Sequence, residues 1–256
     1  MTKKQLKITV MIDDREYSRA ELDAVFNERS YFTLREMQEL GADLRDGSGA
    51  KLTRESIDEI SENTVREVLF ANKLRLGKDE LNRLYEPQYR EADEMWKGIL
   101  AESAPGDYSQ KVARAHIIIT GISAGMVFRL LGKSFNIRKM LLEVEPDHID
   151  TTATSVTEIM GMYGRPTAMK GKLTGVKRPE APSPDHPIRL LGQSHLASDP
   201  SVVNAVAYHQ MKFIKGGIDV LTNAYFPTAT PQELVDGHSV HMGVEFSNLF
   251  WNAAKK

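Results

Sequence analysis

The stretch from residue 230 to residue 254, TPQELVDGHSVHMGVEFSNLFWNAA, constrains the fold of this chain more than any other. Thr230 and Glu233 have the spacing of a capping box, and Pro231 suits the first helical position, so a helix is predicted to begin here. Steps of three and four residues place both polar and apolar side chains on one face of that helix: Leu234, His238, His241, Glu245 and Leu249. Because imidazoles and carboxylates are costly to bury without partners, this face predicts a metal, a polar ligand or an internal network.

Composition limits the classes of protein to which the chain can belong. With 256 residues and 41% hydrophobic composition, it can bury a sizeable core as one large domain or two small ones. The formal net charge of -2 provides no basic field, so nucleic-acid binding is not expected. Because cysteine is absent, any metal must be bound by His, Asp or Glu. No apolar run is long enough to span a membrane and no signal-peptide core is present, so a cytoplasmic protein is expected.

The first hundred residues are predicted to be mostly helical. Alternation of apolar and polar residues predicts a short strand over residues 6–12. Ser18 with Glu21 has capping-box spacing, which predicts a helix, and Thr33 with Glu36 has the same spacing, which predicts a second, separate helix.

A longer amphipathic helix is predicted from residue 52 to residue 76, where Gly77 would end it. The next helical region is expected to be interrupted by Pro87 and to close at the Ala-Pro-Gly sequence of residues 104–106. These features predict an N-terminal helical region over residues 1–105.

The character of the sequence changes after residue 106, where strand-like segments alternate with a helix. A helix capped by Ser123 is predicted over residues 122–133, and residues 151–187 are expected to be mostly irregular. The segments with strand character are 116–120, 136–145, 170–176, 188–196, 205–213 and 217–226. Together with the C-terminal helix they predict an α+β fold, in which a curved antiparallel sheet over residues 106–256 surrounds that helix and encloses a cavity.

The predicted C-terminal helix carries the first candidate metal ligands. His241 and Glu245 are four residues apart, so their side chains lie one turn apart on the same face and can bind one ion. His238 joins that face. The alternative is a pair of helix histidines that hydrogen-bond to carbonyls of the sheet.

A second group of candidate ligands follows the segment 136–145. Residues 143–158 are rich in acidic side chains and include His148 and Glu158, which are the candidate ligands from this part of the chain. The alternative is a solvated acidic loop. His116 and His209 are expected to be structural histidines, and Tyr225 is a candidate hydrogen-bond donor to a substrate oxygen.

Several of these segments resemble the 2,4-diacetylphloroglucinol hydrolase and phloretin hydrolase family. PQELVDGHSVHMGVEFSNLF resembles the family's C-terminal helix, in which an H-x-x-x-E pattern supplies two zinc ligands. GISAGMV, NIRKMLLEVEPDHI and VTEI resemble the family's Gly-Val-Thr-Pro-Glu-Met stretch, its strand ending in Pro-x-Asp-His, and the segment that bears its glutamate ligand. The resemblance covers about residues 115 to 254.

The resemblance implies a helix-grip fold like that of plant pathogenesis-related and START-type proteins, with a zinc ion that supports hydrolysis of an aryl–acyl C–C bond. His241, Glu245 and Glu158 stand at matching positions. The family has one more histidine ligand, in a stretch that here reads VFRLLGKSF and contains no histidine. Three alternatives follow: His148 or His116 completes the site, the metal has fewer protein ligands, or the chemistry has been lost.

The expected partner is a small phenolic or cyclic ketone substrate, with no nucleic acid or membrane partner, and a homodimer is left open. In the expected reaction His238 carries a proton to the leaving ring carbon, and Tyr225 serves as a further catalytic donor. Two other functions remain open at this point. One is another metal-dependent reaction on a small cyclic ketone, catalysed by a lyase, isomerase or cyclase, and the other is a non-enzymatic small-molecule carrier.

Overall fold

The fold is α+β and is built on one antiparallel sheet. The computed structural model describes residues 6–131, 137–162 and 165–255. Within these residues nine strands pair in the order β2-β1-β3-β9-β8-β7-β6-β5-β4, and the sheet is open. In chain order the strands are β1 (Lys7–Ile12), β2 (Arg15–Tyr17), β3 (Lys111–Thr120), β4 (His148–Thr151), β5 (Ser155–Ile159), β6 (Pro166–Lys172), β7 (Ile188–Leu196), β8 (Val203–Ile214) and β9 (Gly217–Phe226).

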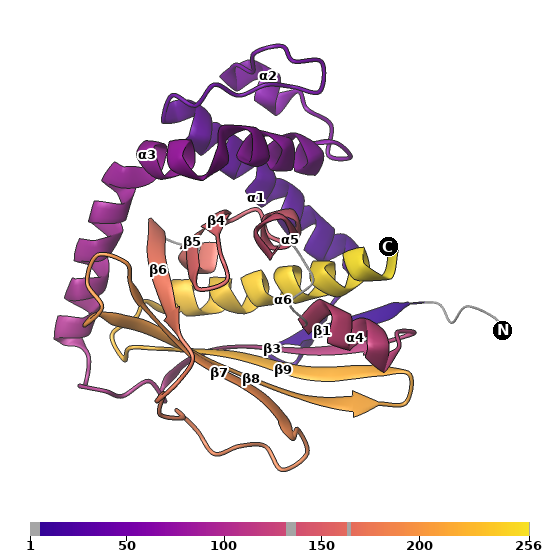
Figure 1. Cartoon of the computed structure of the whole chain (residues 1–256), viewed down its shortest axis with the longest axis vertical. Helices are drawn as coiled ribbons and strands as arrows, with labels where there is room; N and C mark the ends of the chain where they lie inside the picture. Colours follow the sequence, from indigo (N-terminus) through magenta and orange to yellow (C-terminus); the bar gives the residue numbers. More distant parts are fainter. Residues whose placement is uncertain (1–5, 132–136, 163–164, 256) are drawn as a thin grey trace.

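The C-terminal helix packs on this sheet, and further helices pack on the side of this helix that faces away from the sheet. The helices are α1 (Arg19–Glu39), α2 (Arg54–Asp58), α3 (Val65–Glu102), α4 (Ala124–Leu131), α5 (Ile137–Val144), the short 3₁₀ helix η1 (Met160–Met162) and α6 (Gln232–Lys255). Figure 1 shows α6 between the sheet and the helices α1 and α5. Among the described residues, no helix has the length and apolar character needed to cross a membrane.

The two largest hydrophobic clusters form most of the core. The larger one lies between the sheet and α6 and also includes Trp96 of α3. The second lies among α1, α2 and α3, and it reaches Ile149 of β4. The N-terminal helices therefore pack directly against the strand that begins at His148.

Several predicted elements are confirmed. Strands β7 and β9 occupy the predicted ranges 188–196 and 217–226, and the hairpin turn between β8 and β9 contains Gly216 at φ 77°. Ser18 caps α1 through the predicted capping box with Glu21. The Ser123 hydroxyl accepts the Met126 N–H at the start of α4, although the predicted end of that helix lies outside the described residues.

The prediction of two separate helices before residue 44 is wrong, because α1 is continuous from residue 19 to residue 39. Thr33 is buried inside α1, and its hydroxyl donates to the Pro146 carbonyl at 3.2 Å instead of capping a new helix. A contact between segments far apart in the chain thus replaces the local one that the spacing indicated.

The predicted break at Pro87 is also wrong. Helix α3 continues past Pro87, with Leu84 and Tyr85 buried before it and Ala92 buried after it. The interruption lies at Gly77, which has φ 74° and ψ 175° inside the same helical segment. Since this combination of φ and ψ is accessible almost only to glycine, the kink is fixed at this residue.

The strand predicted over residues 136–145 is instead helix α5, and residue 136 lies outside the described residues. Ile137, Met140, Leu141 and Val144 recur at helical spacing, and most of the segment consists of good helix formers. The short strand expected at residues 170–176 begins earlier, as β6.

The predicted C-terminal helix is present as α6, but its start differs from the prediction. The N–H groups of Leu234 and Val235 donate to the Pro231 carbonyl, which closes the first turn. The buried Thr230 hydroxyl has no hydrogen-bond partner among the described residues, so the predicted capping box does not form.

Candidate metal centre

The candidate site is a cavity of about 330 Å³ between α6 and the sheet. Its apolar walls include Met160, Met169, Met242 and Phe246. Its titratable side chains come from β4, β5, β8 and α6, and they are His148, Glu158, His209, His238, His241 and Glu245. All four predicted metal ligands therefore face the same cavity.

Three of these ligands converge on one point. The Glu158 carboxylate oxygen Oε2 lies 3.2 Å from His148 Nε2 and 3.7 Å from His241 Nε2. Ligand atoms of the three residues lie within 4.8 Å of one another, and the exposed fractions of the residues are 2%, 6% and 1% for His148, Glu158 and His241. This buried group could hold a metal ion.

The orientation of His148 fits a ligand. Its Nδ1–H donates to the Leu141 carbonyl at 2.9 Å, and its Nε2 is therefore the nitrogen that faces Glu158. A hydrogen bond on one ring nitrogen is the usual way in which a protein turns the lone pair of the other toward a metal. Helix α5, which carries Leu141, thus fixes the ring.

The charges of His148 and Glu158 depend on the proton between them. Burial by itself lowers the pKa of His148, but the hydrogen bond to Glu158 and the nearby carboxylates raise it to about 9. Burial by itself raises the pKa of Glu158, but His241 and His148 lower it to about 2. The carboxylate is therefore ionised at neutral pH and is balanced by a positive charge on His148, a balance that a metal cation can also supply.

Glu245 lies one turn after His241 on α6 and lines the same cavity. Burial raises its pKa, and the nearby His148 opposes that rise. A donor set of imidazoles and carboxylates without thiolates suits a divalent transition metal, so the residues present fit the metal that the sequence predicted.

His238 lies beside this group. Its ring stacks on that of His241, with the centroids 5.1 Å apart, and meets the ring of Phe226 edge to face. Its Nδ1 is buried and has no hydrogen-bond partner among the described residues. Burial lowers the pKa of His238, so the ring is neutral at neutral pH.

Tyr225, the other predicted catalytic residue, is not brought to the cavity. Its neighbour Ala224 lines the cavity, and successive strand residues point to opposite faces of a sheet. On the other face Tyr225 packs with Val206 and Tyr208, and Arg114 lies over its ring. Tyr225 therefore lies on the outer face of the sheet, where it is buried.

His209 lines the cavity, whereas the sequence led us to expect a structural histidine. Its Nδ1 accepts the Asn223 N–H at 3.3 Å, so the ring proton is on Nε2. Burial lowers its pKa to about 4, which keeps the ring neutral. The alternation of side chains along β8 could have indicated this position, because Ala205, Ala207 and His209 occupy one face of the strand.

Small residues form the sheet side of the cavity. Gly192, Ala207 and Ala224 pair in register across β7, β8 and β9, and all three line the cavity. Gly171 and Ala205 extend this surface. The sheet therefore presents a flat wall opposite the His and Glu side chains of α6.

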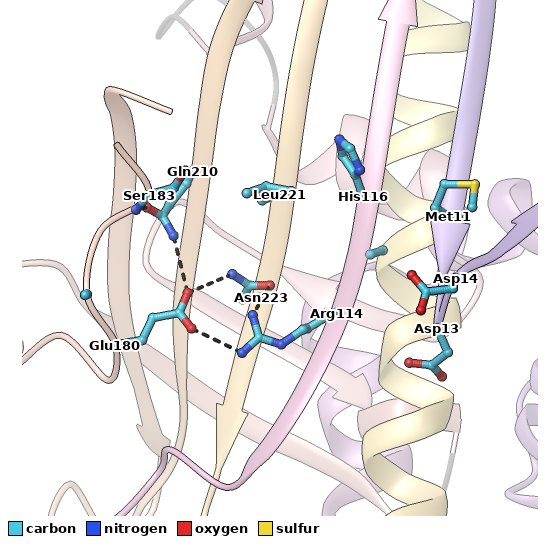
Figure 2. A pocket seen from close by; sticks show the side chains of 12 residues that line it. Met11, Asp13, Asp14, Arg114, His116, Glu180, Ser183, Gln210, Leu221 and Asn223 are labelled. Atoms are coloured by element: carbon cyan, nitrogen blue, oxygen red, sulfur yellow. Dashed lines mark hydrogen bonds and ion pairs between the residues drawn. The ribbon is translucent and has the colours of Figure 1, made fainter. Parts of the chain in front are cut away.

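A larger cavity, of about 550 Å³, lies on the outer face of the sheet (Figure 2). There the Glu180 carboxylate accepts hydrogen bonds from Arg114, Gln210 and Asn223. His116 lines the same cavity and donates to Asp219 at 2.7 Å, so it does not complete the metal group. The group of His148, Glu158 and His241 that could hold a metal ion lies at the inner cavity, which is therefore the better candidate site.

Comparison with known proteins identifies no relative: no family model, curated protein or solved structure matches the chain. The functional argument therefore depends on the geometry of the cavity.

Proposed function

We propose that this protein is a zinc-dependent hydrolase that cleaves the C–C bond between an acyl group and a phenolic or cyclic dicarbonyl ring. The observation that carries the proposal is the buried group of His148, Glu158 and His241 at the cavity, with Glu245 beside it. Two histidines with carboxylate are a ligand set typical of catalytic zinc. The resemblance of the C-terminal helix to the diacetylphloroglucinol and phloretin hydrolases supports the same chemistry.

A helix-grip fold is part of this proposal. The packing of α6 across the sheet, with the cavity between them, supports it. In such an arrangement the inner face of the helix carries the reactive groups and the sheet provides the wall against which a ligand rests.

Zinc would be held by His148, Glu158, His241 and Glu245, and the chemistry it supplies is activation of water near neutral pH and polarisation of a ketone oxygen. His148 would take the position of the histidine that the stretch 127–135 lacks. The site would be formed by side chains from β4, β5 and α6, which meet at the cavity.

His238 is the residue that we assign to proton transfer. Its unpartnered Nδ1 can accept a proton from the attacking water as the hydroxyl group joins the acyl carbon. The bond between acyl and ring carbons then breaks, its electron pair stays on the ring carbon, and Nδ1 returns the proton there. The products are a carboxylic acid and the deacylated ring, and a phenolic ring stabilises the carbanion by ketonisation.

The dimensions of the cavity support a single-ring substrate. An apolar cavity of about 150 Å³ binds benzene. The cavity here, of about 330 Å³, has room for one ring with several substituents. The flat wall of Gly192, Ala207 and Ala224 accommodates a planar ring close to the backbone of the sheet.

Turnover of a monocyclic acylphenol by the zinc-loaded protein tests the proposal. We expect release of the deacylated phenol and the carboxylic acid in equal amounts, and a loss of rate of about 100-fold or more in His238→Gln, since general acid–base catalysis contributes 10²–10⁴-fold. Binding of the acylphenol without any product, by protein that contains zinc, would contradict the proposed reaction and indicate a carrier.

A further inference from the structure

We infer that His209 determines the specificity of the inner cavity, because its Nε2–H donates a hydrogen bond to a ring hydroxyl of the substrate, para to the acyl group. His209 lies on β8, in the wall of the cavity. The inference deepens the proposed function and rests on it, since the acylphenol is the ligand that His209 would bind.

The backbone of β9 determines which ring nitrogen of His209 carries the proton. The Asn223 N–H donates to His209 Nδ1 at 3.3 Å. A backbone N–H can only donate, so Nδ1 holds a lone pair and the proton of the neutral ring is on Nε2. This N–H belongs to β9, which pairs with β8, where a carbonyl of the neighbouring strand would ordinarily accept it. The sheet therefore gives up a bond between the strands and fixes the tautomer of the ring.

The Nε2–H group of His209 has no partner in the part of the chain that the structure describes. A histidine with a purely structural role would usually have one. The ring of Phe246, from α6, meets that of His209 edge to face with the centroids 5.3 Å apart, which restricts its orientation. Because the proton occupies Nε2, this nitrogen offers no lone pair to a metal. The group is therefore a donor for a ligand in the cavity.

The other polar side chains that β7, β8 and β9 bring to this cavity are engaged or point away from it. Ser194 Oγ donates to Asn204 Oδ1 at 3.0 Å. Gln193 lies between Gly192 and Ser194 on β7, so its side chain points to the outer face of the sheet. Among the described residues of these strands, His209 is thus the side chain that offers the cavity a free donor.

The position of His209 matches the far end of a bound acylphenol. Strands β6 and β7 lie between β8 and β5, so His209 and Glu158 line the cavity from strands that are not neighbours. With the ketone oxygen at the proposed metal group, the ring would lie on Gly192 and Ala207, with its para position toward His209. When the bond between acyl and ring carbons breaks, the electron pair on the ring carbon is shared with a para oxygen. A donor at that oxygen therefore also stabilises the developing charge.

Two benzamides of matched size test the inference in zinc-loaded protein. The compounds para-hydroxybenzamide and para-methylbenzamide differ in the para substituent alone, and an amide in place of the ketone resists cleavage during the measurement. We expect His209→Asn to lower the preference for the hydroxyl compound about 10-fold, as loss of one neutral hydrogen bond does. The Asn side-chain oxygen takes the place of Nδ1 and still accepts the Asn223 N–H, but nothing reaches the place of Nε2.

His209→Gln is the complementary change, because the Gln amide N–H reaches the place of Nε2 and should keep the preference. A purely structural role would give the reverse order, with Asn tolerated and Gln not. The matched control is His195→Asn, on a β7 histidine that does not line this cavity, and it should leave the preference unchanged. An unchanged preference in His209→Asn would overturn the inference and leave the proposed function standing.

The wild-type protein provides a readout that does not depend on the folding of any variant. The proton resonance of His209 Nε2–H should move downfield when the hydroxyl compound binds and stay nearly unchanged with the methyl compound. Equal shifts with the two compounds, or an Nδ1–H tautomer in the free protein, would overturn the inference. Failure of both benzamides to bind would overturn it as well, while release of product from an acylphenol would still decide the proposed function.

Discussion

At the scale of single residues, buried charges behind the cavity stabilise the ligands. Arg29 of α1 binds Asp147 in the segment that leads to His148. Lys73 of α3 is fully buried, and burial lowers its pKa to about 7 although Asp147 and Glu145 oppose that change. These contacts give the N-terminal helices a direct role in holding the segment from Glu145 to His148.

Arg29→Met tests the importance of this ion pair. The substitution leaves Asp147, whose side chain has an exposed fraction of 0%, without its partner. Loss of one partner of a buried pair typically costs 3–5 kcal/mol, so we expect the free energy of unfolding in urea to fall by about that amount. The control is Arg83→Met, which removes an exposed pair with Glu80 and should leave the free energy of unfolding nearly unchanged. Equal losses in the two variants would contradict this role.

His209 predicts a dependence of stability on pH. Its pKa is lowered to about 4 by burial, from a value near 6.5 in the unfolded chain, so the unfolded state binds more protons between these values. Its contribution to stability is therefore complete above pH 6.5 and is lost as the pH falls toward 4. Because the ring borders a cavity, we expect His209 to account for about 1–2 kcal/mol of the loss between pH 7.5 and pH 5, measured by urea unfolding of wild type and His209→Gln. His209→Gln should reduce this loss, and an unchanged loss would show that other groups cause it.

Residue spacing predicted the members of the candidate site that share one element. His238, His241 and Glu245 were found from the spacing along a single helix. His148 and Glu158 were found because their segment is rich in candidate ligands, and Glu158 also from the family resemblance; the structure pairs the two residues across β4 and β5. Tyr225 does not line the cavity, and residue type does not reveal which face of a strand a side chain occupies.

At the scale of elements, two glycines set the distance between α6 and the end of β5. A side chain at Gly237 would place its Cβ 1.8 Å from the Gly161 carbonyl oxygen, far inside contact distance. Gly161 has φ 62°, in the left-handed region that favours glycine. This close approach brings Glu158, three residues before Gly161, to the histidines of α6.

Gly237→Ala should therefore separate α6 from η1. We expect a loss of about 1–3 kcal/mol in thermal unfolding experiments, because the added methyl group overlaps backbone that cannot move aside. Zinc content should fall as well, since the separation displaces Glu158 from His241. Gly98→Ala in α3 is the control: its Cβ would meet nothing within 4 Å, so it should be neutral or stabilising. Full stability and full zinc content in Gly237→Ala would contradict this account of the packing.

Element prediction succeeded where local rules decided the outcome. The hairpin of β8 and β9 follows from a glycine turn between two β-rich segments, and α1 begins at a complete capping box. It failed at residues 136–145, where hydrophobic residues at helical spacing were taken for a strand, and at Thr33, where a tertiary hydrogen bond replaced a cap.

At the scale of the whole molecule, the sheet and two helical layers meet at the cavity. Strands β1 and β2 join the same sheet as the C-terminal strands, and the second hydrophobic cluster connects α1, α2 and α3 with Ile149. The pair between Arg29 and Asp147 joins residues 118 positions apart. Contacts over such separations leave no local pattern, so the role of the N-terminal helices was not predictable from the sequence.

The metal content of protein purified without added metal tests the central claim most directly. The account predicts close to one zinc per chain, strongly reduced in both His241→Ala and Glu245→Ala while circular dichroism shows that both variants remain folded. Folded wild-type protein that contains no transition metal, and binds none when zinc is supplied, would contradict it.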